Sequence, residues 1–464
     1  MQSRLLVSVT LLAACGDNTS LYEKGEELAG GETTVFETGN QAFSLSARNL
    51  TSDRRAGFFD GNAFFKRNWV TAPASTSGQD GLGPTFNAPA CASCHLFDGR
   101  GSPPAEATDE DFLGLLVRLS IPGADAHGGP LDEPNYGGQF NHHSILQVPA
   151  EGRSHVAYTE APGAFADGTP YSLRIPTYTF TELAFGAMDP NVMTSPRVAN
   201  VMIGLGLLEA ISEDEVLVSA DENDEDGDGI SGRPNMVWDV TSQSATLGRF
   251  GWKANQPSIV QQVQGAFNGD IGITSALFPN QNCPAAQTAC ANAINGDDPD
   301  DGNVEADAQV ISTVIYYSRL LAVPARRDVE STDVLYGKQL FHEAGCASCH
   351  PPKHVTGDLE GLPEVSQQTI FPYTDLLLHD MGDADADHRP DFLATGNEWR
   401  TPPLWGLGLV PVVNGHSTMM HDGRARNVAE AILWHGGEAS KARDAFNKMS
   451  VRERDQLVKF VESL

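Results

Sequence analysis

The sequence predicts a mainly α-helical protein with long loops and little β-structure, organised as two domains. The pentapeptide Cys-Ala-Ser-Cys-His occurs twice, at 91–95 and 346–350. Segments in which apolar and polar residues alternate, as in strands, are few. The chain has 464 residues, of which 40% are hydrophobic, so it is long enough for more than one core. We therefore expect each pentapeptide to lie in its own domain.

Five segments have the apolar spacing or the capping residues of helices. Residues 334–341 follow a Ser-Thr cap and end before Gly345, while 450–464 repeats apolar residues at helical spacing. The other helices are expected at 108–119, 197–211 and 310–321. Glycine-rich stretches at 136–139 and 161–170 are expected to form loops.

Each pentapeptide matches Cys-x-x-Cys-His, the pattern for covalent attachment of c-type haem. On a helical turn, residues i, i+3 and i+4 share one face, so two thiols can meet the porphyrin while the imidazole reaches the iron. The expected cofactors are thus two covalently attached haem c groups. Their binding residues are Cys91, Cys94 and His95, and Cys346, Cys349 and His350. The alternative is one zinc site built from two Cys-x-x-Cys knuckles, although zinc does not require the adjacent histidine in both copies.

The N-terminus has the form of an export signal. Arg4 precedes an apolar run that ends in Leu-Ala-Ala-Cys, which predicts a lipoprotein signal peptide at 1–14 and lipidation of Cys15. A flexible tether is expected at 15–45. The alternative is an ordinary signal peptide with an incidental cysteine. Either way we expect the periplasm or cell envelope, and a lipid on Cys15 would be the contact to a membrane surface.

Two further cysteines, Cys283 and Cys290, lie in one short loop. An oxidising compartment permits a disulfide between them, worth about 2 to 3 kcal/mol by the chain-entropy estimate. Two unpaired thiols are the alternative.

The formal net charge is −31, which makes nucleic acid a poor partner because phosphate contacts need clustered Lys and Arg. A partner protein is expected to be basic, or to meet a local patch of opposite sign.

The helix at 334–341 before the second motif and the C-terminal helix at 450–464 are arranged as in small cytochrome c domains. The Pro- and charge-containing segment 322–328 resembles a linker. We therefore expect two cytochrome c-like haem domains, at 46–322 and 323–464.

The segment 221–231 concentrates carboxylates at alternate positions, notably Asp224, Asp226 and Asp228, which resembles a calcium loop. Asn235 stands where an EF-hand has its bidentate glutamate. Bound Ca²⁺ and a merely solvated acidic loop both remain open.

Six segments together resemble the di-haem oxidoreductase family, formerly called thiol oxidoreductase-like. They are 91–101, 227–235, 248–254, 373–382, 398–408 and 421–426. The resemblance covers nearly the whole chain after the signal. More distantly, the C-terminal part is similar to bacterial di-haem cytochrome c peroxidases and to di-haem enzymes that oxidise residues on a partner protein.

The resemblance implies an exported oxidoreductase, peroxidase-like, with one electron-transfer haem and one substrate-reactive haem. A small redox protein or another donor would supply electrons. A second ligand makes a haem an electron-transfer centre, whereas a vacant position lets peroxide bind. For the second haem, the resemblance places His435 as the distal ligand, with Met381 as the rival and His379 nearby.

For the first haem, candidate distal residues are Gln139, His142, His143, Met188 and Met193. Glu160, Glu182 and Arg197 have the chemistry to move a proton or assist charge separation. Gln139, Glu182 and Arg197 are the predicted catalytic set. The alternative function is a non-catalytic electron-transfer protein with both irons six-coordinate; oxidation of residues on a partner protein is a third, narrower option.

Overall fold

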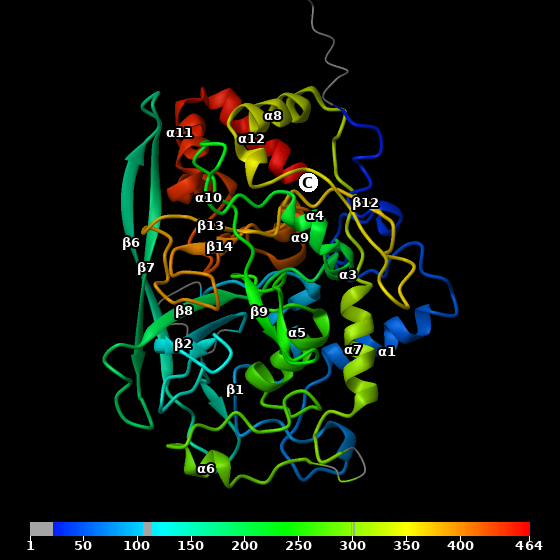
Figure 1. Cartoon of the computed structure of the whole chain (residues 1–464), viewed down its shortest axis with the longest axis vertical. Coiled ribbons are helices and arrows are strands. Elements are labelled where there is room, and N and C mark those ends of the chain that lie inside the picture. Colours follow the sequence, from blue (N-terminus) through cyan, green and yellow to red (C-terminus); the bar gives the residue numbers. More distant parts are fainter. Residues whose placement is uncertain (1–21, 105–112, 298, 300–301) are drawn as a thin grey trace, which may run out of the picture.

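A computed structural model of the chain describes residues 22–104, 113–297, 299 and 302–464 (Figure 1). The predicted lipidation site, Cys15, and the signal peptide lie outside the described residues. In the part of the chain that the model covers, no helix combines the length and the apolar composition needed to cross a bilayer.

The larger core is built around α1 (Arg55–Lys66) and α7 (Ala308–Arg319). A Cβ at Gly61 would lie 2.3 Å from the carbonyl oxygen of Thr313, so glycine allows the two helices to approach closely. The Asp307 side chain caps α7 by accepting from the amide of Val310. The shorter helices α3 (Leu205–Ala210) and α5 (Ile259–Ala266) pack on the same core. The helix predicted at 310–321 is therefore confirmed.

The second core contains α8 (Thr332–Glu343) and the C-terminal α12 (Val451–Ser463). Both helices were predicted, and Ser450 with Glu453 forms a capping box at the start of α12. At Gly337 a Cβ would lie 2.0 Å from the Gln456 carbonyl oxygen, so the helices cross in backbone contact. Two further helices complete this part, α10 (Val428–Trp434) and α11 (Ser440–Lys448).

The expectation of a mainly α protein with little β-structure is wrong. Of the residues that the structure describes, 28% are helical and 19% are in strands. A four-stranded antiparallel sheet joins β2 (Leu115–Ala124) to β8 (Met193–Val198), with two short strands, β3 (Pro130–Leu131) and β4 (Gln139–Phe140), also beside β2. A separate hairpin pairs β6 (Arg153–Ala164) with β7 (Pro170–Thr181) over their whole lengths.

The errors arose where apolar residues fall on both faces of a strand. Leu115, Val117 and Leu119 point into one core, but Leu116 between them interrupts the alternation, so the sequence favours a helix at 108–119 instead of a strand. Residues 108–112 of that prediction lie outside the described residues. Likewise 197–211 begins as the end of β8 and becomes helical only at Leu205. The stretch 161–170 is the tip of the long hairpin and not a free loop.

The remaining elements are short. Four two-stranded antiparallel sheets pair β1 (Thr85–Phe86) with β5 (His143–Ser144), β9 (Met236–Asp239) with β10 (Ser244–Leu247), β11 (His354–Val355) with β12 (Thr369–Ile370), and β13 (Leu378–Asp380) with β14 (Glu398–Arg400). The short helices are α4 (Glu213–Leu217), α6 (Thr288–Ala291) and α9 (Val410–Asn414).

The β6–β7 hairpin runs along one side of the molecule, from the sheet that contains β2 to the helices α11 and α12 (Figure 1). At its base, Tyr178 and Phe180 pack on the core beside β2. At its tip, Phe165 packs against Phe446 of α11, and Asp167 pairs with Arg454 of α12 at 2.8 Å. The hairpin therefore connects the core beside β2 with the helices α11 and α12.

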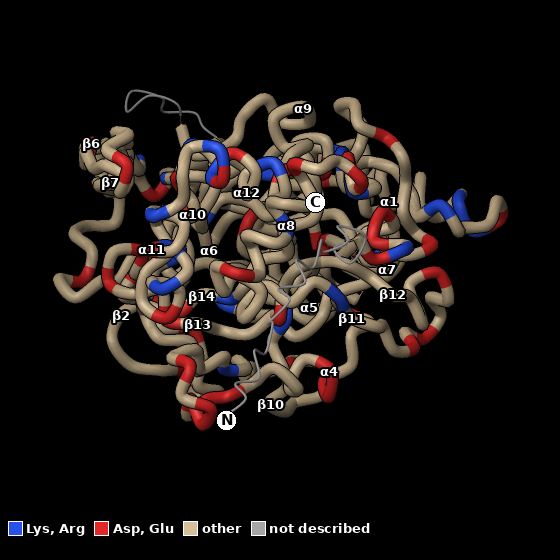
Figure 2. The backbone as a smooth tube through the Cα atoms, turned by 90° about the horizontal axis from the view of Figure 1, so that it is seen from above, with Lys and Arg blue, Asp and Glu red and all other residues tan. Residues whose placement is uncertain are grey.

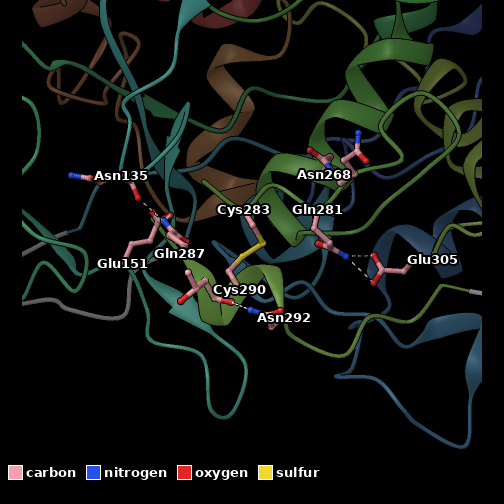
Figure 3. The surroundings of a disulfide bond; sticks show 11 residues. Asn135, Glu151, Asn268, Gln281, Cys283, Gln287, Cys290, Asn292 and Glu305 are labelled. Carbon is pink, nitrogen blue, oxygen red and sulfur yellow. Dashed lines mark hydrogen bonds between the residues drawn. A yellow bond between two sulfur atoms is a disulfide. The ribbon is translucent and has the colours of Figure 1, made fainter. Parts of the chain in front are cut away.

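The disulfide joins Cys290 of α6 to Cys283 in the preceding loop (Figure 3). Next to it, the Gln287 amide donates to the buried carboxylate of Glu151 at 2.6 Å. Acidic residues are distributed around the outside of the molecule, in keeping with the net charge (Figure 2).

Residues 22–45, expected to belong to a flexible tether, are folded. Phe43 is fully buried, and Val35 pairs with Pro324. The carboxylate of Glu26 is buried between Arg326 at 2.8 Å and Lys338 at 2.5 Å. This segment thus joins the two cores.

We predict that Glu26→Gln lowers the free energy of unfolding by about 3 to 5 kcal/mol, because it leaves buried cations without their anion. Urea unfolding followed by circular dichroism measures this loss. Glu23→Gln is the matched control, since Glu23 pairs with Lys353 at an exposed position and should change stability by less than about 1 kcal/mol. Equal losses in the two variants would contradict a role for the buried pair.

Candidate functional site

The two pentapeptides fold into the same local shape. The first forms α2 (Cys91–Cys94), and the second forms a 3₁₀ turn at Cys346–Ser348. In both copies the histidine amide donates to the carbonyl of the first cysteine at 3.0 Å. Each turn therefore brings its cysteines and histidine to one side, as the spacing predicts.

Both motifs line one cavity of about 620 Å³. All six predicted attachment residues are in its wall, and none of the four cysteines is in a disulfide. Burial raises the pKa of Cys91, Cys94 and Cys346 to about 12, and also raises that of Cys349. These cysteines are thus neutral thiols.

Within the described ranges, the one group of Cys, His, Asp or Glu side chains close enough to share a metal ion consists of Asp221, Asp224 and Asp226. The four motif cysteines do not come together. A zinc site made from both pairs is therefore not formed.

Three half-buried histidines of the cavity wall share one hydrogen-bonding pattern. The Nδ1 of His95 faces the carbonyl oxygen of Asn200 at 2.8 Å, that of His350 faces Tyr373 at 2.8 Å, and that of His435 faces Ala431 at 2.7 Å. Burial lowers the pKa of each, that of His350 to about 4, so the rings are neutral. A neutral ring that donates through Nδ1 keeps the Nε2 lone pair for a metal.

The arrangement favours His435 over Met381 as the partner of the second motif. His435 is near enough to His350 that its positive form would lower the pKa of His350. Met381 lines the cavity but packs with Trp252 and Trp399, in a different apolar cluster from Cys346.

His379 is held between two carboxylates and has no free nitrogen. Its Nε2 lies 2.8 Å from Asp375 and its Nδ1 lies 2.8 Å from Glu438. Burial alone would lower the pKa of His379, but these hydrogen bonds outweigh it and raise the pKa well above its usual range. The ring is therefore an imidazolium and is not a ligand for iron.

Of the predicted catalytic set, Arg197 lines the cavity. Its guanidinium donates to Ser195 at 2.9 Å and to Asp391 at 3.1 Å, which holds it in the wall. Gln139 and Glu182 are not among the cavity-lining residues.

Gln139 is buried behind the wall, where its amide donates to Gly269 and to Asp270, both at 2.9 Å. Glu182 is exposed and pairs with Arg153 at 3.1 Å at the base of the hairpin. These positions put Gln139 and Glu182 away from the cavity.

The other candidate residues for the first haem also differ in whether they line the cavity. His142 lines the cavity. Glu160 is exposed on the hairpin and pairs with Arg426 at 3.1 Å. His143, Met188 and Met193 are outside the cavity wall.

Sequence reasoning missed two buried arginines, Arg100 and Arg400, in the cavity wall. Arg100 donates to the Met420 carbonyl and has an unpartnered Nε, while Arg400 donates to the Gly251 carbonyl at 2.9 Å. Among the described residues neither has a carboxylate within 4.0 Å, and burial lowers the pKa of both to about 10.

A buried cation needs an anionic partner, and each haem carries two propionates. The cavity, the neutral imidazoles, the thiols and these two arginines therefore fit haem. Both arginines lie in the quoted motif segments 91–101 and 398–408, but nothing in the sequence shows that they are buried.

In the acidic loop, the structure brings Asp221, Asp224 and Asp226 together, with ligand atoms within 4.8 Å of one another. Asp228, predicted as the third residue, instead accepts from the Ile230 amide at 2.8 Å. Asn235 is buried and donates to the Lys253 and Asp391 carbonyls, away from the loop.

We predict that Glu438→Gln destabilises the protein in a pH-dependent way. Burial opposes ionisation of Glu438, but hydrogen bonds from His379 and Ser231 lower its pKa from 4.5 to about 2. A depressed carboxyl pKa stabilises the fold above about pH 4.5, and this contribution fades as the pH falls towards 2. The variant should lose about 2 to 3 kcal/mol at pH 7 and progressively less below pH 4.5.

Urea unfolding across this pH range provides the measurement. Asp444→Asn on α11 is the control, because Asp444 is exposed and pairs only with its neighbour Arg443. A loss for Glu438→Gln that does not vary with pH would disprove the proposed linkage.

Comparison with known proteins identifies the family. No curated protein matches the chain. Among solved structures, the hydrazine synthase of Kuenenia stuttgartiensis is 13% identical, with 100% of both chains covered and a TM-score of 0.35, which is too low to support an inference. A family model described as "Di-haem oxidoreductase, putative peroxidase" matches residues 23–464. Because this match spans almost the whole chain, the protein belongs to the di-haem oxidoreductase family.

Proposed function

We propose that this protein is an exported di-haem c-type oxidoreductase that reduces peroxide with electrons from a small redox protein. The observation that carries the proposal is the single cavity lined by both Cys-x-x-Cys-His motifs and by His435, which is close enough to His350 to lower its pKa. One haem is proposed to transfer electrons and the other to react with substrate.

Covalent attachment is proposed through Cys91 and Cys94 for the first haem, and through Cys346 and Cys349 for the second. The neutral thiols suit addition to porphyrin vinyl groups, and no competing disulfide holds them. The haems supply reversible one-electron chemistry and, where a coordination position is open, a site for peroxide.

At the second haem, His350 and His435 offer two neutral imidazoles whose Nδ1 atoms are anchored to backbone carbonyls. Such anchoring fixes the ring orientation and strengthens the imidazole as a ligand. Two strong ligands favour electron transfer over substrate binding. The second haem is therefore proposed to receive electrons from the donor.

At the first haem, His95 is the anchored imidazole, and the buried Arg197 stands in the same cavity wall. Its guanidinium is held by Ser195 and Asp391, so it is oriented before substrate arrives. A fixed cation of this kind stabilises the charge that develops as the peroxide O–O bond breaks. The overall reaction consumes two electrons and two protons and yields two water molecules.

Export and a lipid anchor are proposed from the N-terminal sequence, which places the protein in the periplasm or cell envelope. Folded structure is described from residue 22, so only residues 15–21 separate Cys15 from it. Even fully extended, that distance is at most about 25 Å. A lipid on Cys15 would therefore hold the folded part close to the membrane surface.

A Ca²⁺ ion is proposed at Asp221, Asp224 and Asp226, whose carboxylate oxygens already converge. The loop also contacts the C-terminal part, because Ser231 donates to Glu438 at 2.6 Å. A bound ion would therefore stabilise both the loop and the contact between Ser231 and Glu438.

Electron paramagnetic resonance tests the assignment of the two haems. We expect the oxidised protein to show one low-spin and one high-spin ferric haem, with two haem c per chain by pyridine haemochrome. His435→Ala should convert the low-spin haem to high-spin, whereas Met381→Leu should leave its spectrum unchanged, since only a lost strong ligand opens the iron.

The reverse pattern would assign Met381 as the ligand. Two low-spin haems in the oxidised and half-reduced protein, together with no peroxide-dependent oxidation of a reduced donor, would reject the peroxidase and favour an electron carrier.

Calcium binding has its own test. Millimolar Ca²⁺ added to chelator-treated protein should raise Tm, because a ligand that binds only the folded state stabilises it. Asp224→Asn with Asp226→Asn should abolish the rise, while Asp228→Asn should keep most of it. An unchanged Tm in the parent protein would remove calcium from the proposal.

A further inference from the structure

Four buried carboxylates lie in or behind the cavity wall: Asp385, Asp387, Asp391 and Asp422. Three of them have close cationic partners. Asp387 pairs with Lys253 at 2.7 Å, Asp391 with Arg197 and Arg389 at 3.1 Å each, and Asp422 with Arg424 at 3.0 Å. Such partners keep buried carboxylates ionised.

Asp385 differs from these three. It alone of the four lines the cavity, and its Oδ1 is enclosed without a hydrogen-bond partner among the described residues. Its nearest cation is Nη1 of Arg424 at 3.3 Å, but Arg424 already binds both oxygens of Asp422 and donates to the Ala384 carbonyl. The charge of Asp385 is therefore poorly compensated.

His421 is the second polar neighbour of Asp385. Its Nε2 lies 3.6 Å from the Asp385 carboxylate, and its Nδ1 faces the Pro196 carbonyl at 2.9 Å. Stacking on Trp399, with ring centroids 3.9 Å apart, holds the ring in the cavity wall. Burial lowers the pKa of His421 to about 4, so its ring is neutral and its Nε2 accepts from the Arg424 guanidinium at 3.3 Å.

Burial is also the main reason that the pKa of Asp385 rises, to about 7. The charged and titratable groups that act on it are Arg424, Asp422 and His421 on the turn before α10, Lys253 on the loop before α5, and Asp387 on its own loop. Behind these, Arg197 on β8 acts on Lys253, and Tyr178 on β7 acts on Arg424. Asp385 is thus a cavity-lining carboxyl whose protonated form is favoured by burial.

We propose that Asp385 is the proton-exchanging group of the cavity, taking up a proton from solvent when the haems gain an electron and passing it towards substrate in the cavity that it lines. The inference rests on the proposed function in that haem occupies the cavity. Each electron comes from the donor protein, and each is matched by one proton, so the charge in the cavity is conserved. Two such cycles supply the two protons that reduction of one peroxide to two water molecules requires.

The test is a spectroelectrochemical titration of both haems between about pH 5 and about pH 9, which needs no turnover. In the parent protein, the midpoint potential of at least one haem should fall as the pH rises through neutrality. The equilibrium constant for reduction should change by up to tenfold per pH unit, which is about 59 mV for one electron. Asp385→Asn should remove this dependence. Asp383→Asn should keep it, because Asp383 is an exposed carboxyl two residues away.

Potentials that do not vary with pH in the parent protein, or a slope unchanged in Asp385→Asn, would overturn the proposal. If Asp385→Asn fails to hold two haems, redox-difference infrared spectroscopy of the parent protein decides. A protonated carboxyl signal that grows on reduction supports the proposal, and its absence overturns it. If the midpoint potential depends on pH through Asp385 but the protein does not turn over peroxide, the peroxidase function is rejected and the role of Asp385 in proton exchange is kept.

Discussion

One cavity shared by two distant haem-binding motifs is the constraint on which the rest of the structure depends. Its wall combines segments that are more than 250 residues apart in the chain, from α2 to the turns around α10. The anchoring groups are mostly backbone carbonyls in irregular segments, such as those of Asn200 and Tyr373. Long loops are therefore useful here, because they present carbonyls that helices and strands would use internally.

Buried charge is the second consequence of this architecture. Lys253 and Asp387 have no exposed side-chain surface, and Arg197 is almost as buried beside Asp391. Removing one member of such a pair is costly because the other charge stays buried. These pairs also join segments far apart in the chain, because Arg197 and Lys253 precede residue 322 whereas Asp391 and Asp387 follow it.

The same principle applies at the periphery. The N-terminal segment is held by the ion pairs of Glu26 with Arg326 and Lys338. The β6–β7 hairpin extends from the core beside β2 to Phe446 of α11. The N-terminal segment thus links the two cores, and the hairpin links the second core to the cluster beside β2. Electron transfer between two haems benefits from such rigidity, since it depends on a fixed distance.

The sequence by itself determined the haem motifs, the helices that flank the second one, and the family, because these are local patterns of a few residues. It misjudged β2 and the long hairpin, where strand pairing with distant segments overrides local signals. Only the tertiary structure shows that Arg197 lines the cavity whereas Gln139 and Glu182 do not. It also shows that Arg100, Arg400 and Asp385 are in the cavity wall. Burial and the distance to a partner decide what a charged side chain does, and both arise from contacts between residues far apart in the chain.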